Sequence, residues 1–207
     1  GVEMNYHTLS DFRVERGEDL DDLLIQMLAV MTHQGVVQLA RVAQDGMRVR
    51  ADAGAASFRR QGTLEEHLAA ARKQVEDLRK ELDEDPARRN RAEQAAAQRA
   101  ARERVEALER ALAEMPKVIE SKRRQRAKKG KKVGEPRVST TDSDARVMKM
   151  PDGGFRPAFN VQLATDADSR VVVGVRVTNE GSDQGQLVPM LDEIKRCTGV
   201  VPGEYLV

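Results

Sequence analysis

The fold of this chain depends on one stretch, Val42-Ala43-Gln44-Asp45-Gly46-Met47-Arg48-Val49-Arg50-Ala51-Asp52. It follows the β-prone residues 36–41 and places a carboxylate, Asp45, directly before Gly46. An Asp-Gly pair between alternating apolar residues favours a two-residue hairpin turn, because both positions tolerate a positive φ. The alternative is that Asp45 is a metal-binding carboxylate on a rigid strand. The rest of the chain has to decide between these two interpretations.

Composition limits the possible architectures. The chain has 207 residues, enough for one domain or for one domain with an insertion. It is 33% charged but only 3% aromatic, so we expect part of it to lack a thick core. The single cysteine, Cys197, excludes an intrachain disulfide and a cysteine-based zinc site, and it suits a cytoplasmic localisation. No apolar run approaches the ~18 residues of a membrane span, so we expect no membrane partner.

The N-terminal region has two parts. Residues 1–17 are polar and predict irregular structure. Apolar residues then recur three and four positions apart from Leu20 to Met31, which predicts an amphipathic helix that ends at Gly35.

A long helical hairpin is expected after the opening stretch. Thr63 and Glu66 form a capping box, and the apolar seam that follows is Leu64, Leu68, Ala71, Val75, Leu78 and Leu82. Pro86 starts a second helix, expected to end near Met115, whose seam is Ala101, Val105, Leu108, Leu112 and Met115. The short connection favours an antiparallel hairpin, which could serve as a partner-binding arm, a dimer arm or a DNA clamp.

A dense basic run follows the hairpin. Its cationic residues are Lys122, Arg123, Arg124, Arg126, Lys128, Lys129, Lys131 and Lys132. Such a run is often a poorly ordered, solvated linker, and its usual function is contact with nucleic-acid phosphates. It contains no aromatic residue to stack on bases, which argues against sequence-specific reading of a single strand.

Globular patterning returns in the last third of the chain. Residues 155–165 and 171–177 predict two strands joined by a hairpin that contains Asp166 and Asp168, and the second strand has the apolar character of a central strand. A helix is expected from about Gln186 to Gly199, followed by a strand from Glu204. A polar loop before these strands carries two neighbouring carboxylates, Asp142 and Asp144.

Without the hairpin and the basic run, the order of elements is strand, strand, strand, helix, strand. This order matches the first half of an RNase H-like domain, so we predict an α+β fold: a partial RNase H-like core with a long antiparallel helical hairpin inserted after its first strand. The expected divisions are an N-terminal helical segment (1–35), a first core part (36–58), the hairpin (59–116), a basic linker (117–137) and a second core part (138–207).

Several segments of the sequence resemble those of bacterial insertion-sequence transposases of the DDE superfamily. The resemblance is carried by Tyr6-His7-Thr8-Leu9-Ser10-Asp11-Phe12-Arg13, Val42 to Val49, Asp142-Ser143-Asp144-Ala145-Arg146-Val147-Met148-Lys149, Gly153 to Gln162, Val177-Thr178-Asn179 and Ser182-Asp183-Gln184. It implies that Asp45 is the first catalytic acid, that a second aspartate comes immediately beyond Val207 and that a glutamate lies further on. It also implies that an N-terminal DNA-binding segment is missing.

The resemblance further implies DNA transposition by two-metal phosphoryl transfer. Mg²⁺ or Mn²⁺ would be the cofactor, and Asp45 a metal ligand. Asp142 and Asp144 are further candidate ligands, with loop capping as the alternative. Double-stranded DNA, as transposon ends and target, would be the partner of a homo-oligomeric enzyme that cuts the ends and joins the 3′-hydroxyl to the target. With one of three catalytic carboxylates, the chain alone is expected to be inactive. A metal-dependent RNase H-like nuclease and a non-enzymatic coiled-coil or DNA-binding protein are the alternatives.

Overall fold

The computed structural model describes residues 5–84, 91–129 and 134–207. It divides into two compact units, Gly1–Arg48 with Asn160–Val207 and Val49–Phe159. The described residues form helices and a mixed β-sheet, which confirms the predicted α+β class and the predicted helical hairpin.

The first unit is built on a sheet with the order β6-β5-β1-β7. These strands are β1 (Arg41–Arg50), β5 (Phe155–Asp166), β6 (Val172–Thr178) and β7 (Glu204–Leu206). The β5–β6 pair is antiparallel, and the β1–β7 pair is parallel. The β1–β5 pair is antiparallel, since the amide of Ala167 donates to Arg41 at one end and that of Ala51 donates to Pro157 at the other.

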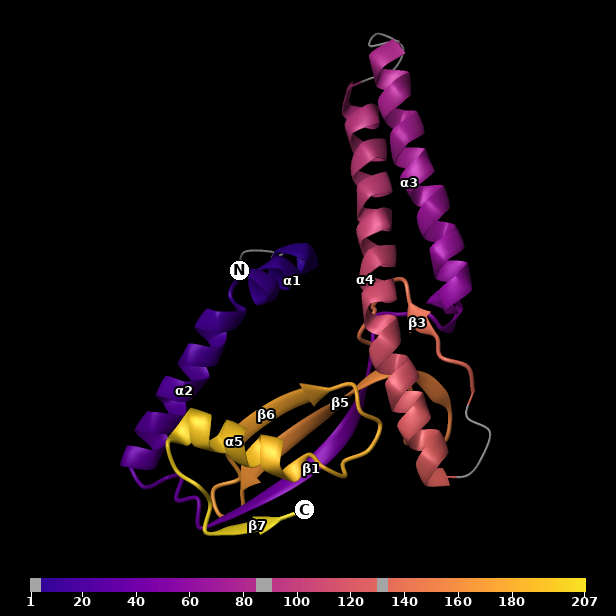
Figure 1. Ribbon diagram of the computed structural model, residues 1–207. Helices are drawn as coiled ribbons and strands as arrows, with labels where there is room; N and C mark the ends of the chain where they lie inside the picture. Colours follow the sequence, from indigo (N-terminus) through magenta and orange to yellow (C-terminus); the bar gives the residue numbers. More distant parts are fainter. Residues whose placement is uncertain (1–4, 85–90, 130–133) are drawn as a thin grey trace. The chain divides into compact units, whose positions relative to one another are not determined.

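The core of this unit lies on one face of the sheet. Helix α5 (Leu187–Thr198) packs against β6, and α2 (Gly17–His33) packs against α5 (Figure 1). The buried side chains come from α2, the segment between α2 and β1, β1, β5, β6 and α5: Leu28, Val37, Leu39, Val42, Ala164, Val173, Met190, Ile194 and Cys197. This burial explains the helical periodicity of α5, whereas in α2 it involves Leu28, and Leu20, Leu23 and Met27 on the same helix are exposed.

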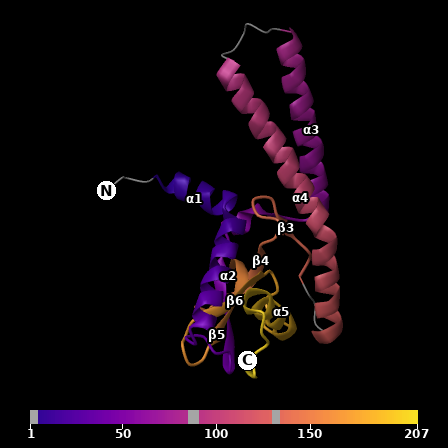
Figure 2. The ribbon, with the colours of Figure 1, turned by 90° about the vertical axis from the view of Figure 1, so that its left-hand side faces the viewer.

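The structure corrects two expectations for this unit. Residues Tyr6–Glu15 form a helix, α1, which meets α2 at an angle (Figure 2), so the prediction of irregular structure there was wrong. Strand β6 pairs only with β5 among the described strands, so it is an edge strand and not the expected central one. Its apolar start is explained by Val173, which is fully buried against the core that includes α5.

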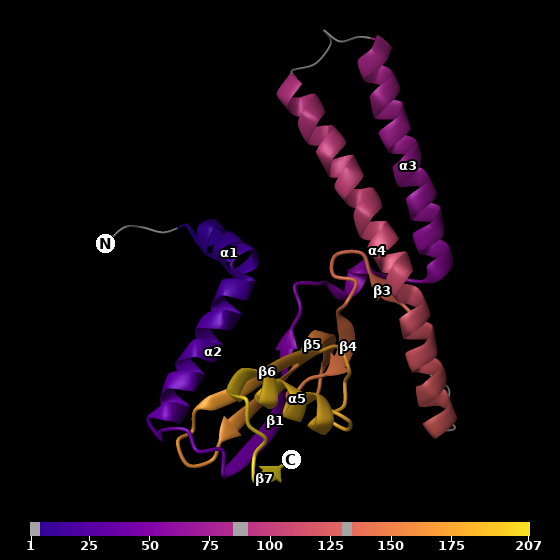
Figure 3. The ribbon, with the colours of Figure 1, turned by 60° about the vertical axis from the view of Figure 1, so that its left-hand side comes forward.

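The second unit contains the hairpin of α3 (Gln61–Glu84) and α4 (Arg91–Lys129), which separate toward their connection (Figure 3). The predicted seams meet in part: Leu64, Ala71, Leu108 and Met115 are buried together with Ala111, Val118 and Val138, which the seams did not include, and Leu68, Val105 and Leu112 are partly buried. Near the base, the 3₁₀ turn η1 (Ala55–Ser57) leads into β2 (Phe58–Arg59), which pairs with β3 (Val138–Ser139). Strand β4 (Arg146–Lys149) pairs with residues 155–158 of β5.

The second helix of the hairpin is longer than predicted. It continues through Pro116 to Lys129, so the expected end near Met115 was wrong and much of the expected linker 117–137 is helical. Met115 and Val118 are both buried on the side of α4 that faces the seam, which holds the helix together across the proline. The Lys and Arg residues that follow have high helix propensity and favour its continuation.

None of the described helices combines the length and the apolar character that crossing a membrane requires.

Candidate active site

The stretch that contains Asp45 is an uninterrupted strand. β1 runs through both Asp45 and Gly46, and Gly46 has no positive φ, so the hairpin-turn interpretation was wrong. Asp45 is exposed, and its Oδ1 accepts a hydrogen bond of 2.8 Å from the amide of Gly46. The strand therefore presents a carboxylate to solvent from a paired backbone.

Gly46 has a steric role on the other face of β1. A Cβ at this position would come closer than 3.0 Å to Nε2 of Gln162 and Oδ1 of Asp183. Successive residues of a strand point to opposite faces, so these groups lie behind the strand and not beside the Asp45 carboxylate. A glycine inside a strand commonly marks such a close approach.

The groups behind Gly46 form a hydrogen-bonded set, here called the polar cluster: Arg48, Asn160, Gln162 and Asp183. The Nδ2 atom of Asn160 donates to Oδ1 of Asp183 at 2.8 Å, and Nε2 of Gln162 donates to the same oxygen. Arg48 donates to Oδ1 of Asn160 at 2.8 Å and lies 3.4 Å from Oδ1 of Asp183. The cluster joins β1, β5 and the loop that precedes α5.

Hydrogen bonding also sets the electrostatics of the cluster. The donors Asn160, Gln162 and Arg48 hold the pKa of Asp183 below its ordinary value of 3.8, with Asn160 contributing most. Partial burial opposes this shift, and the positive charge of Arg48 supports it. Asp183 is therefore an anion at neutral pH and an acceptor for all three neighbours.

A second chain of hydrogen bonds connects the cluster to β7. Gln44 donates to Oε1 of Gln162 at 2.7 Å and accepts from the hydroxyl of Tyr205 at 2.7 Å. Burial raises the pKa of Tyr205 to about 12, so this hydroxyl remains a donor at physiological pH. Side chains from three neighbouring strands thus fix the inner face of the sheet on both sides of Gly46.

The carboxylates of Asp142 and Asp166 have structural roles. Oδ1 of Asp142 accepts the amides of Asp144 and Ala145 at 3.1 and 3.2 Å, which is the loop-capping alternative. Asp166 is buried at the end of β5, where its carboxylate accepts the amides of Leu39 and Ser169. Asp166 is the last residue of β5, and the turn of the predicted hairpin follows it at residues 167–169.

The side chains available as ligands determine whether the described residues could bind a metal ion. Within residues 5–84, 91–129 and 134–207, no group of three or more His, Cys, Asp or Glu side chains could hold a metal ion. Asp45 suits a hard cation as one oxygen ligand, since its carboxylate is exposed and, among the described residues, its hydrogen bond is the one that Oδ1 accepts from the neighbouring amide. The described residues thus provide one ligand at Asp45.

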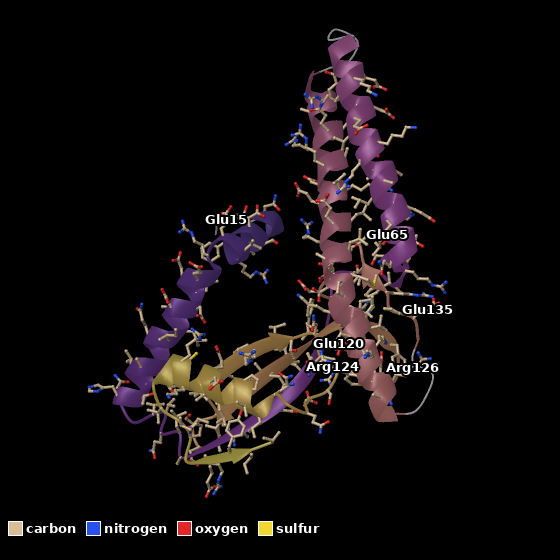
Figure 4. The ribbon with its side chains drawn as sticks, viewed as in Figure 1. Glu15, Glu65, Glu120, Arg124, Arg126 and Glu135 are labelled. Carbon is tan, nitrogen blue, oxygen red and sulfur yellow. The ribbon has the colours of Figure 1, made fainter. Side chains whose placement is uncertain are left out.

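The basic residues predicted to contact nucleic acid lie mostly on a helix. Arg123, Arg124 and Arg126 are exposed in the last turns of α4. Figure 4 labels Arg124 and Arg126. Glu120 lies 3.9 Å from Arg123 and 3.7 Å from Arg124, and such exposed pairs are weak enough to exchange for phosphate. The helix also includes Lys122, Lys128 and Lys129, whereas Lys131 and Lys132 lie outside the described residues.

The polar cluster was not predicted from the sequence. Asn160 and Gln162 alternate with Phe159, Val161 and Leu163, yet the structure buries the two amides and leaves the apolar residues partly exposed. Two amides alternating within an apolar strand, together with a glycine inside another strand, could have indicated a buried polar contact. They could not have identified Asp183 as the common acceptor, because it lies more than 130 residues from Gly46 in the chain.

Comparisons of the chain with protein-family models, with curated proteins and with solved structures gave no match. A functional proposal therefore depends on the geometry around Asp45 and on the resemblance in the sequence itself.

Proposed function

We propose that this chain forms part of the catalytic core of a DDE transposase of the RNase H-like class, with Asp45 as its first metal-binding carboxylate. The observation that carries the proposal is the position of Asp45, exposed on an inner strand of the mixed sheet and close to the parallel neighbour β7. The strands β1, β5 and β6, the helix α5 and the strand β7 follow the expected order, with the additional short strands β2, β3 and β4 between β1 and β5.

The pairing of β1 with β7 supports a second carboxylate beside Asp45. In this pair Ala43 is opposite Leu206, so a continued register places Val207 opposite Gln44 and the next position opposite Asp45. The family pattern has its second aspartate at that next position. Neighbouring strands lie about 4.8 Å apart, and residues in register share a face, so two such carboxylates could bind the same divalent ion.

Each part of the chain then has a task in phosphoryl transfer. Bound Mg²⁺ would supply Lewis-acid stabilisation of the attacking and leaving oxygens. Asp45 would provide an oxygen ligand from a strand whose other face is held by the polar cluster. The cationic side chains near the end of α4 would neutralise DNA phosphates without reading bases.

The test is cleavage of DNA from both sides of the reading frame, with Mg²⁺ or Mn²⁺, by the protein that the whole reading frame encodes. We expect cleavage and joining of the new 3′-hydroxyl to target DNA, and we expect Asp45→Ala to remove both. Asp168→Ala is the matched control, because Asp168 is also exposed but lies in the β5–β6 hairpin.

Two results would change the proposal. Cleavage that Asp45→Ala leaves intact would overturn the role of Asp45. Metal-dependent cleavage without any joined product would instead indicate a nuclease of the same fold.

A further inference from the structure

We propose that Asp183 and the rest of the polar cluster are positioning residues that hold the Asp45 segment of β1 in place from behind. This inference depends on the proposed function for its catalytic meaning. Its structural content is that the loop 179–186 keeps residues 44–47 in one position.

Gly46 is in close contact with the side chains of the polar cluster. The space that a Cβ would need there is taken by Gln162, Asp183 and, at 3.0 Å, Oδ1 of Asn160. The backbone of β1 therefore rests directly on polar side chains at the residue that follows Asp45. A movement of Gly46 toward this face is blocked by three side chains at once.

The loop 179–186 is attached to both β1 and β5. Arg48 donates to the carbonyl of Gly181 at 3.1 Å, and Asn160 donates to that of Glu180 at 3.2 Å. Together with the bonds to Asp183, these contacts join the loop to β1 through Arg48 and to β5 through Asn160 and Gln162. Asp183 is the central acceptor, because one carboxylate receives hydrogen bonds from all three donors.

Loss of the Asp183 carboxylate would disturb the hydrogen bonds of its three donors. Three donors would lose their common acceptor, and two of them, Asn160 and Gln162, are residues that are 0% and 1% exposed. Asn160 would keep the Glu180 carbonyl as acceptor at 3.2 Å and Gln162 would keep Oδ1 of Asn160 at 3.0 Å, and both amides would reorganise to replace the lost bond. Reorganisation beside Gly46 would release the strand that carries Asp45, and catalytic rates are sensitive to displacements of about 1 Å.

The matching experiment uses the protein of the whole reading frame and measures two things. The first is the rate of DNA cleavage at saturating DNA as a function of Mg²⁺ concentration. The second is amide hydrogen exchange in residues 44–47. The variants are Asp183→Ala, Asp183→Asn and Gly46→Ala. The controls are Asp168→Ala for the aspartate and Gly62→Ala for the glycine, because a Cβ at Gly62 would meet nothing within 4 Å.

We expect Asp183→Ala and Gly46→Ala to lower the cleavage rate about 100-fold and to raise the Mg²⁺ concentration needed for half-maximal rate, while KM for DNA stays unchanged. Exchange of the 44–47 amides should be at least about tenfold faster in both variants. Asp183→Asn should recover part of each loss, because its Oδ1 can still accept from Asn160 and Gln162. The two controls should behave as the wild type.

Several outcomes would overturn the positioning role. Unchanged exchange at residues 44–47 in Asp183→Ala would do so whether or not the protein cleaves DNA. A loss of rate that only follows a lower folded fraction, with an unchanged Mg²⁺ requirement, would show a purely structural role. Failure of the proposed function appears differently, as no cleavage by the wild type or as activity in Asp45→Ala, and the exchange measurement still decides the positioning role in that case.

Discussion

The two units of this protein are stabilised in different ways. The α3–α4 hairpin is held by an apolar seam between two helices, with Leu64, Leu108 and Met115 among its buried residues. The sheet unit buries apolar residues as well, but the side of β5 that faces inward also carries Asn160, Gln162 and Asp166. One unit is stabilised by a periodic apolar pattern, and the other depends in addition on specific hydrogen bonds between distant segments.

The difference has a physical basis in how each interaction depends on geometry. Apolar burial is nearly non-directional, so a seam tolerates small shifts of one helix along the other. A buried amide or carboxylate costs free energy unless its partner is in place, so a polar cluster favours one arrangement. We infer that the hairpin provides a stable scaffold, while the sheet unit provides precise positions.

The largest expected effect tests the apolar side of this comparison. Leu64 is 0% exposed, so Leu64→Ala should lower the free energy of unfolding by about 2–5 kcal/mol through lost burial and a cavity. Urea denaturation followed by circular dichroism measures this loss. Leu20→Ala is the control, since Leu20 also lies in a helix but is 40% exposed, and it should cost clearly less. Equal losses in the two variants would contradict the assignment of Leu64 to the core.

A smaller effect is expected from one polar contact of the sheet unit. Asp166→Ala removes the acceptor of the amide of Leu39, a buried residue held at a positive φ of 55°. An unpaired buried amide costs about 1–3 kcal/mol, and the strained backbone of Leu39 would lose its support. The same denaturation experiment applies, with the exposed Asp168→Ala expected to change stability by less than about 0.5 kcal/mol.

The smallest expected effect is a difference between the two units in how the stability lost by a substitution depends on pH. The pKa of Asp183 is lower in the folded protein than its ordinary 3.8, mainly because Asn160 donates to it. Its ionised form therefore stabilises the fold above about pH 3.8, and this contribution disappears as the pH falls through the lower folded value. The stability difference between wild type and Asp183→Asn should shrink from pH 7 to pH 3. The cost of Leu64→Ala relative to wild type should stay constant, and a parallel change in both differences would contradict this separation.

The hairpin shows what local patterning can predict. Its seam residues, its antiparallel arrangement and its start near Thr63 follow from spacing and capping, because neighbours three and four apart always share a helix face. The end of α4 could not be predicted in the same way. A proline normally stops a helix, and only the burial of Met115 and Val118 around Pro116 shows why this one continues.

The sheet unit shows the opposite balance. Asp45 was identified from its neighbours in the sequence, but Asp-Gly also fits a turn, and local propensity cannot separate a turn from a strand interior. Long-range pairing of β1 with β5 and β7 decides that question. The same pairing brings Asp183 behind Gly46, a contact that no spacing rule could indicate.

The sequence by itself determined the α+β fold class, the helical hairpin, the positions of most strands and Asp45 as the residue of interest. Each of these depends on periodicity or on residue chemistry within a short window. The tertiary structure alone decided that Gly46 lies in a strand, that β6 is an edge, and that Arg48, Asn160, Gln162 and Asp183 form one hydrogen-bonded cluster. These features depend on which distant segments become neighbours, and the free energy of that choice is shared by the whole sheet and is not encoded in any single stretch.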